Sequence, residues 1–130
     1  MKIPGLYIAP SELAGRGVFC AEDISAGSVI EICPMLILPP DQVKAIESTD
    51  LYDYYFQWKE DEESCGIALG YGSLYNHSYS PNARYFTDFE TNTLDVIALL
   101  DIPAGKEITF NYNGEPDNLE EVWFLKNEEE

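Results

Sequence analysis

Residues 68–82 have the sequence ALGYGSLYNHSYSPN, in which an apolar segment, a glycine-rich bend and a polar segment follow one another. A short apolar segment at 67–69 predicts a strand, which enters a glycine-rich bend at 70–73. The polar residues that follow are too long a run, and too marked by Asn and Pro, to predict another strand. Asn76, Ser78 and Asn82 are typical of a turn held by Asx-type hydrogen bonds. The stretch therefore predicts a strand followed by a polar, non-strand segment.

Short apolar segments separated by Gly, Pro and Ser lie on the N-terminal side of this stretch. Their β-branched and aromatic residues predict four short strands, at 6–9, 18–20, 29–32 and 35–38. After two prolines, Asp41 is expected to cap a short helix that ends near residue 48. The aromatic segment 51–58 favours a strand or a packed turn over an exposed helix, and the acidic run 60–63 favours a solvated loop.

The C-terminal side continues the β pattern. Apolar segments predict three more strands, at 83–89, 94–100 and 107–112. The dipeptide Asn113-Gly114 predicts a tight turn, and the apolar residues on one side of 118–126 predict a helix. No repeat or linker interrupts the pattern. The sequence therefore predicts one mainly β domain, 1–130, with two short helices.

Composition excludes several classes of function. The chain has 130 residues and a formal charge of −17, which argues against direct binding to nucleic acid or to an anionic membrane. We see no apolar stretch of the roughly 18 to 20 residues that a membrane span needs and no signal peptide, so we expect a soluble intracellular protein. Cys20, Cys33 and Cys65 form no C-x-x-C pair and are expected to be core thiols, not a disulfide framework or a zinc site.

Three motifs could carry chemistry. Gly15-Arg16-Gly17 lies between two expected strands, so it is either a hairpin turn or a place where a ligand approaches the backbone closely. Asn76-His77-Ser78 has the form of a glycosylation sequon, but an Asx-type turn suits a chain without a secretion signal better. A tyrosine at the end of a strand, such as Tyr112, is ordinarily a packing residue of the core or the surface. The chain's nine tyrosines could, however, line an aromatic pocket with hydroxyl tips, suited to a long aliphatic amine.

Taken together and in this order, the motifs resemble the SET domain of protein-lysine methyltransferases, and residues 68–78 look especially like the minimal SET proteins of large viruses and bacteria. The matching elements, spread over about residues 6–114, are 15–19, 23–31, 76–78 with 81–82, 102–107 and 108–112. The resemblance implies a SET-domain fold of several short-stranded sheets with a pseudoknot-like C-terminal segment and short helices. In that fold, 115–130 would be a short helical segment.

The resemblance also implies roles for individual residues. Tyr112 matches the family's catalytic tyrosine, Tyr54 looks like a tyrosine of the lysine channel, and Tyr85 lies near the position that governs how many methyl groups are added. The cofactor would be S-adenosylmethionine. The implied cofactor-binding residues are Gly15, Arg16, Gly17, Asn76, His77, Tyr112 and Trp123. Trp123 belongs equally well to an ordinary helix docked on a sheet. No Cys follows Tyr112, so no metal is expected.

The expected function is transfer of a methyl group from S-adenosylmethionine to the ε-amine of a lysine in a basic protein, with a histone tail favoured. A free lysine, with a pKa of about 10.4, is mostly charged at pH 7, and an aromatic channel lowers that pKa by excluding water. The alternative is a catalytically inactive module that binds basic peptides. The acidity would attract such peptides, or it reflects solubility alone. A homodimer could complete the site, and the location would be cytoplasmic, or the host nucleus for a viral or eukaryotic protein.

Overall fold

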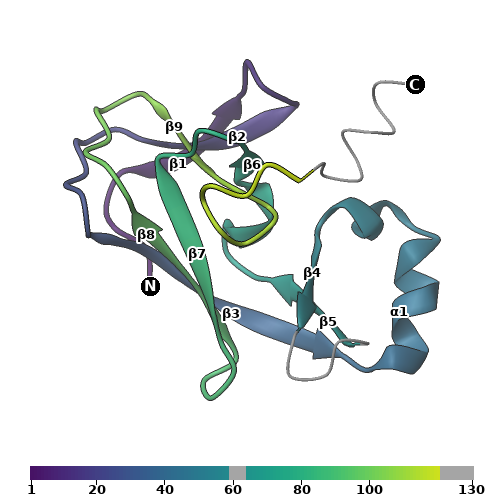
Figure 1. Ribbon diagram of the computed structural model, residues 1–130. Coiled ribbons are helices and arrows are strands. Elements are labelled where there is room, and N and C mark those ends of the chain that lie inside the picture. Colours follow the sequence, from purple (N-terminus) through teal and green to yellow (C-terminus); the bar gives the residue numbers. More distant parts are fainter. Residues whose placement is uncertain (59–63, 121–130) are drawn as a thin grey trace.

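The structure, a computed structural model, describes residues 1–58 and 64–120. Within these residues the strands form two sheets, one of four strands in the order β1-β2-β9-β6 and one of five in the order β4-β5-β3-β8-β7 (Figure 1). The mainly β prediction is confirmed. In chain order the elements are β1 (Leu6–Pro10), β2 (Arg16–Cys20), β3 (Val29–Leu38), α1 (Pro40–Glu47), the 3-10 helix η1 (Asp50–Asp53), β4 (Tyr55–Trp58), β5 (Ser64–Ala68), the 3-10 helix η3 (Gly72–Leu74), β6 (Asn76–His77), β7 (Ala83–Asp88), β8 (Thr93–Ala98) and β9 (Glu107–Phe110).

The longest strand, β3, joins the two halves of the five-stranded sheet. It pairs with β8 from Val29 to Pro34 and with β5 from Met35 to Leu38. The prediction of two separate strands here was wrong. Pro34 has no N–H to donate, but it lies where the ladder with β8 ends, and its carbonyl accepts a hydrogen bond from the Leu69 N–H at 2.9 Å. The proline is therefore compatible with one continuous strand.

The hairpin of β7 and β8 follows the sequence pattern closely. The two strands pair from Ala83 opposite Ala98 to Asp88 opposite Thr93, which confirms the two strands predicted at 83–89 and 94–100. Alternate residues of β8 are buried, as expected for a strand with one face on the core. In this hairpin β7 is an edge strand of the five-stranded sheet, and β8 lies between β7 and β3.

The C-terminal strand β9 lies between two strands from distant parts of the chain. It is antiparallel to β2, with Val18 opposite Ile108, and parallel to β6, with Asn76 opposite Thr109. This insertion gives the pseudoknot-like C-terminal segment that was expected. The two-residue strand β6 lies in the polar stretch for which no strand was predicted. That prediction was wrong because two paired residues leave no periodic signal in a sequence.

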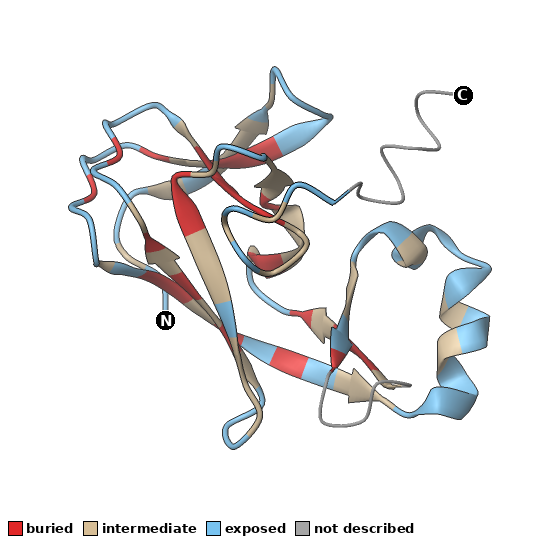
Figure 2. Ribbon diagram, viewed as in Figure 1, coloured by how far each residue is buried: buried red, intermediate tan, exposed pale blue. Residues whose placement is uncertain are grey.

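Buried side chains concentrate where the two sheets meet (Figure 2). All three cysteines are free and buried, as predicted. Helix α1, which follows β3, has no buried residue and lies at one end of the molecule. The predicted helix is present, but the prediction that Asp41 caps it was wrong, because Pro39 holds the N-cap position without a side-chain hydrogen bond and Asp41 lies in the first turn.

Three further predictions meet different outcomes. The aromatic segment 51–58 divides into part of η1 and the strand β4. Residues 118–120 are not helical, and the rest of the predicted C-terminal helix, like the predicted acidic loop at 60–63, lies outside the described residues. Among the described helices, none has the length and apolar character needed to cross a membrane.

Candidate active site

One end of the site is a group of three polar side chains, Ser11, Asn76 and Glu107, which we call the polar clasp. The Asn76 amide nitrogen lies 3.1 Å from the Ala14 carbonyl, 3.0 Å from the Arg16 carbonyl and 2.7 Å from Glu107 Oε2. The other carboxylate oxygen, Oε1, accepts a hydrogen bond from the Ser11 hydroxyl at 2.5 Å. The clasp thereby fastens the main chain of the Gly15-Arg16-Gly17 motif to β6 and β9.

The two glycines of this motif serve different purposes. Gly15 has a φ of +48°, with nothing within 4 Å of an added Cβ, so it meets the conformational demand of the turn. A Cβ on Gly17 would lie 2.2 Å from Glu107 Oε2 and 3.0 Å from the Asn76 amide nitrogen. Gly17 is therefore needed for close approach to the clasp. The motif therefore forms the predicted turn, and the close approach at Gly17 is to side chains of this chain, while approach of a ligand stays a prediction.

His77 connects the clasp to the tyrosines. Its Nδ1 accepts a hydrogen bond from the Tyr112 N–H at 3.0 Å, and its ring packs edge-on against Tyr79 at 4.3 Å. Burial lowers the pKa of the imidazole, which favours the neutral ring with its proton on Nε2. Nε2 is buried and has no hydrogen-bond partner among the described residues. It is therefore a donor whose hydrogen bond is not satisfied within the described part of the chain.

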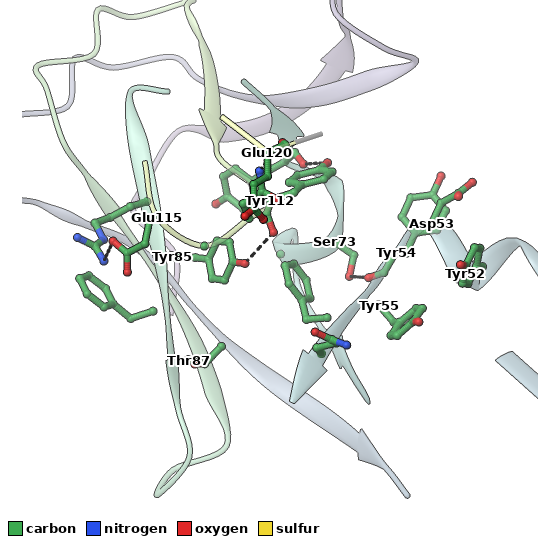
Figure 3. Close-up of a pocket in the computed structure, with 18 residues that line it drawn as sticks. Tyr52, Asp53, Tyr54, Tyr55, Ser73, Tyr85, Thr87, Tyr112, Glu115 and Glu120 are labelled. Carbon is green, nitrogen blue, oxygen red and sulfur yellow. Dashed lines mark hydrogen bonds and ion pairs between the residues drawn. The ribbon is translucent and has the colours of Figure 1, made fainter. Parts of the chain in front are cut away.

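A cavity of about 770 Å³ lies at the C-terminal end of β9, within the size range of small-molecule and cofactor sites (Figure 3). All three tyrosines that the sequence put forward, Tyr54, Tyr85 and Tyr112, line it. We call it the tyrosine pocket. It is lined by Tyr52, Asp53, Tyr54, Tyr55, Phe56, Gln57, Gly72, Ser73, Tyr75, Arg84, Tyr85, Phe86, Thr87, Tyr112, Asn113, Gly114, Glu115 and Glu120.

Main-chain carbonyls orient the hydroxyls of Tyr85 and Tyr112. The Tyr112 hydroxyl donates a hydrogen bond to the Tyr75 carbonyl, and the Tyr85 hydroxyl donates to the Tyr112 carbonyl at 3.1 Å. Burial, and then the charges of Tyr54, Glu107 and Tyr85, raise the pKa of Tyr112. Burial and the nearby Glu115 raise the pKa of Tyr85 to about 12. Both hydroxyls therefore keep their protons at neutral pH.

Tyr54 differs from the other two tyrosines. Its side chain is exposed by 42% and lies at the edge of the pocket, apart from the central pair of Tyr85 and Tyr112 (Figure 3). Its carbonyl accepts a hydrogen bond from the Ser73 hydroxyl at 3.2 Å, which holds this segment against η3. Tyr54 can therefore contact a ligand at the entrance, while Tyr85 and Tyr112 contact what reaches the interior.

The aromatic rings behind these hydroxyls form one packed group around Phe110. The ring centroids of Tyr85 and Tyr75 lie 4.9 Å and 5.2 Å from that of Phe110. Phe56 packs edge-on against Tyr85 at 5.4 Å. Such tilted and edge-to-face contacts fix ring positions. Sequence reasoning did not assign Phe110 or Tyr75 to the site, although both lie within motifs that it quoted.

Two more polar residues shape the site and were missed in this role. Asn82 is buried, accepts a hydrogen bond from the Thr109 N–H and donates one to the Glu107 carbonyl, each at 2.9 Å. It thereby sets the position of β9. Glu107 was expected only as the first residue of a strand. The signal in the sequence that could have pointed to this role is the charge of Glu107 at the start of a predicted strand.

The remaining predicted site residues are Arg16 and Trp123. The Arg16 side chain is exposed, and its carbonyl contributes to the clasp. Trp123 lies outside the described residues. Within 1–58 and 64–120, no group of three or more His, Cys, Asp or Glu side chains could hold a metal ion.

Comparison with known proteins matches this chain to the SET domain family model over residues 15–113. It is 33% identical to a Schizosaccharomyces pombe protein named histone-lysine N-methyltransferase, H3 lysine-37 specific, over 95% of this chain and 82% of that protein. It is 32% identical to the variant-silencing SET domain-containing protein of Plasmodium falciparum, over 85% of this chain and 5% of that protein.

Solved structures are also similar to this chain. A Plasmodium falciparum protein described as a histone methyltransferase superposes with a TM-score of 0.68 at 30% identity, over 95% of this chain and 98% of that chain. A chain of the ctPRC2 complex superposes with a TM-score of 0.70 at 25% identity, over 83% of this chain and 14% of that chain.

Proposed function

This chain belongs to the SET domain family, and from that premise we propose that it transfers a methyl group from S-adenosylmethionine to the ε-amine of a lysine in a basic protein. The observation that carries the proposal is the link between the polar clasp and the tyrosine pocket. Asn76 belongs to the clasp, its neighbour His77 accepts from the Tyr112 N–H, and the Tyr112 hydroxyl faces the pocket. One set of residues can therefore hold a cofactor beside a channel for an amine.

The first task of the pocket is to favour the neutral amine. At pH 7 only about one free lysine in 2,500 is neutral, since its pKa is about 10.4. Only the neutral form has the lone pair that attacks a methyl group. Rings from β4, β7 and the segment after β9 line the pocket and exclude water from a bound side chain. Desolvation lowers the pKa of an amine, so the pocket raises the reactive fraction.

The second task is orientation. The Tyr112 hydroxyl donates its hydrogen bond to the Tyr75 carbonyl, which leaves its oxygen lone pairs to accept a hydrogen bond from an amine N–H. Its raised pKa keeps it protonated, so Tyr112 acts by directing the amine and not as a base. Holding a nucleophile in line can supply several kcal/mol of the barrier reduction. The ammonium loses its proton to solvent water before the attack, at the pocket edge where Tyr54 is exposed.

The cofactor would be held by the clasp side of the site. S-adenosylmethionine, when bound, supplies a methyl group activated by a positively charged sulfur. The buried Nε2–H of His77 lacks a partner within residues 1–58 and 64–120, and the clasp holds the main chain of residues 14–16 at the edge of β2. These groups fit a ligand that carries both hydrogen-bond acceptors and a polar amino-acid end. We assign Gly15, Arg16, Gly17, Asn76, His77 and Tyr112 to this role, together with Trp123.

We propose a histone tail as the favoured substrate. Asp53, Glu115 and Glu120 line the tyrosine pocket, and the chain carries a charge of −17, so basic peptides are attracted and accelerated towards the site. The matched Schizosaccharomyces pombe relative is named for a histone lysine. Action on a histone would place the protein in or near the nucleus.

The test is transfer of labelled methyl groups from S-adenosylmethionine to histones and to a lysine-rich peptide library, read by mass spectrometry. We expect lysine methylation by the unaltered protein and a fall of at least about 100-fold for Tyr112→Phe, since a directing hydroxyl is lost. Tyr7→Phe is the matched control, because Tyr7 stacks on Phe19 outside the pocket.

The outcomes separate the two function classes. Cofactor binding without transfer to any lysine would mean that the correct substrate or a second copy of the chain is missing. No cofactor binding, combined with binding of basic peptides, would favour the catalytically inactive module.

A further inference from the structure

A carboxylate lies buried in the core without a part in the chemistry described above. Glu31, in β3, is only 1% exposed. Its Oε1 accepts a hydrogen bond from the Tyr75 hydroxyl at 2.8 Å, and its Oε2 accepts one from the Tyr71 N–H at 3.0 Å. A β-bulge between Val29 and Glu31 locally breaks the alternation of the strand, so that both Ile30 and Glu31 are buried.

Stability alone gives a poor account of this residue. Burying a carboxylate costs several kcal/mol, and an apolar residue of similar size usually stabilises a core better. Among the described residues no ion pair involves Glu31. The surroundings are instead shaped to receive it. A Cβ on Gly70, which has a φ of +66°, would lie 2.4 Å from Oε2, so the chain passes the carboxylate at a distance that only glycine allows.

Tyr75 connects this carboxylate to the proposed active site. Its hydroxyl donates to Glu31, and its carbonyl accepts the hydrogen bond from the Tyr112 hydroxyl. The residue is 1% exposed, and its ring packs against Phe110 at 5.2 Å. A shift of the Tyr75 main chain would move the carbonyl that sets the direction of the Tyr112 hydroxyl, and such a shift would also strain the contacts of the buried side chain.

We propose that Glu31 is a positioning residue for methyl transfer: it fixes both ends of the segment 71–75, and so fixes the Tyr75 carbonyl that orients Tyr112. This inference rests on the proposed function. It goes beyond that function in assigning a role to a residue that touches neither the pocket nor the clasp. Reactions that depend on alignment lose as much as about 100-fold in rate for a displacement of about 1 Å.

The main test variant is Tyr75→Phe, which keeps the ring and removes the hydrogen bond to Glu31. Tyr71→Phe is the matched control, because Tyr71 reaches Glu31 through its main-chain N–H, which the substitution preserves. We expect Tyr75→Phe to lower kcat by at least about tenfold while the dissociation constant of S-adenosylmethionine stays within about threefold. The control should keep the unaltered kcat. All rates are measured per cofactor-binding site and well below the unfolding temperature.

A second pair of variants tests the carboxylate. Glu31→Leu removes both acceptors and should lower kcat to a similar degree. Glu31→Gln can still accept from the Tyr71 N–H and donate to the Tyr75 hydroxyl oxygen, so it should recover part of the rate. In a chain that already carries Tyr112→Phe, neither Tyr75→Phe nor Glu31→Leu should lower the residual rate further, because both act through Tyr112.

The outcomes distinguish this inference from the proposed function. An unaltered kcat for Tyr75→Phe, or an equal loss with and without the Tyr112 hydroxyl, would overturn the positioning role and leave methyl transfer intact. Absence of methyl transfer by the unaltered protein would overturn both. If Glu31→Leu fails to fold, the comparison of Tyr75→Phe with Tyr71→Phe still tests the positioning role.

Discussion

The polar clasp and the tyrosine pocket lie at opposite ends of β9, and they are built in different ways. The clasp consists of hydrogen bonds from Ser11, Asn76 and Glu107 that hold main-chain atoms of other segments. The pocket contains packed rings, and the hydroxyls of its central pair, Tyr85 and Tyr112, each donate to one main-chain carbonyl. Damage to the clasp should change the path of the main chain, whereas damage to the pocket should change the direction of a single hydroxyl.

The difference predicts two separable classes of effect. Changes in the clasp should weaken cofactor binding, because they move the backbone that would contact it. Changes in the pocket should alter turnover or the product while cofactor binding is kept. A clasp variant that alters only turnover, or a pocket variant that weakens only cofactor binding, would contradict this division of roles.

The largest effect is expected for Gly17→Ala. The added Cβ would lie 2.2 Å from Glu107 Oε2. That carboxylate cannot move aside without losing its hydrogen bonds to Ser11 and Asn76. We expect the dissociation constant of S-adenosylmethionine, measured by calorimetry, to rise by at least about 100-fold.

Gly27→Ala is the control for Gly17→Ala. Gly27 has a φ of +86° and nothing within 4 Å of an added Cβ, so the substitution strains the backbone without touching the clasp. It should lower stability by about 1 kcal/mol and leave the dissociation constant unchanged. Equal loss of cofactor binding in both variants would mean that general destabilisation, and not the clasp, explains the effect.

Asn76→Ala should have the next largest effect. It removes the amide that holds the Ala14 and Arg16 carbonyls, so we expect cofactor binding to weaken by about tenfold, with kcat at saturating cofactor within about threefold. Ser11→Ala is the comparison, because it removes a hydrogen bond to Glu107 but leaves both carbonyls held. An unaltered dissociation constant for Asn76→Ala would remove the clasp from cofactor binding.

The residues of the tyrosine pocket could be predicted from the sequence more completely than those of the polar clasp. The tyrosines lie in short motifs whose order along the chain is informative, and Tyr54, Tyr85 and Tyr112 do meet in one cavity. The strands with a clear apolar period, such as β7 and β8, were likewise predicted. These features depend on residue type and local pattern, which a single sequence records.

What sequence reasoning missed depends on partners far apart in the chain. Glu31 accepts from Tyr75, 44 residues away, and Ser11 donates to Glu107, 96 residues away. Nothing local marks these residues as buried or paired. The continuous strand β3 was missed for a related reason, because only its switch from β8 to β5 explains why Pro34 is tolerated.

A smaller effect is expected for Tyr85→Phe, which changes the product more than the rate. The Tyr85 hydroxyl lies in the pocket interior and donates to the Tyr112 carbonyl at 3.1 Å. Its removal leaves room beside the amine for a methyl group, so mass spectrometry should show a several-fold increase of di- and trimethylated over monomethylated lysine. Tyr54→Phe, at the exposed edge, should leave this ratio unchanged. A shift in the edge variant alone would reverse the two assignments.

The smallest effect concerns the residue that joins the two regions, His77. Burial lowers the pKa of its folded-state imidazole below the unfolded value of about 6.5, so its contribution to stability is present above that pH and is lost as the pH falls through the range below it. Acid also reduces the self-repulsion of a chain with a charge of −17, which acts in the opposite direction. The two effects must therefore be separated by a variant.

His77→Asn is that variant, because its side-chain oxygen can accept from the Tyr112 N–H but does not titrate. Between pH 7 and pH 5 the unaltered protein should lose stability relative to His77→Asn, by less than about 1 kcal/mol after allowance for solvent screening, in denaturant unfolding at each pH. Parallel stability curves for the two proteins would show that His77 is not held neutral. The link between clasp and pocket would then rest on geometry alone, without the buried Nε2–H donor assigned to the cofactor.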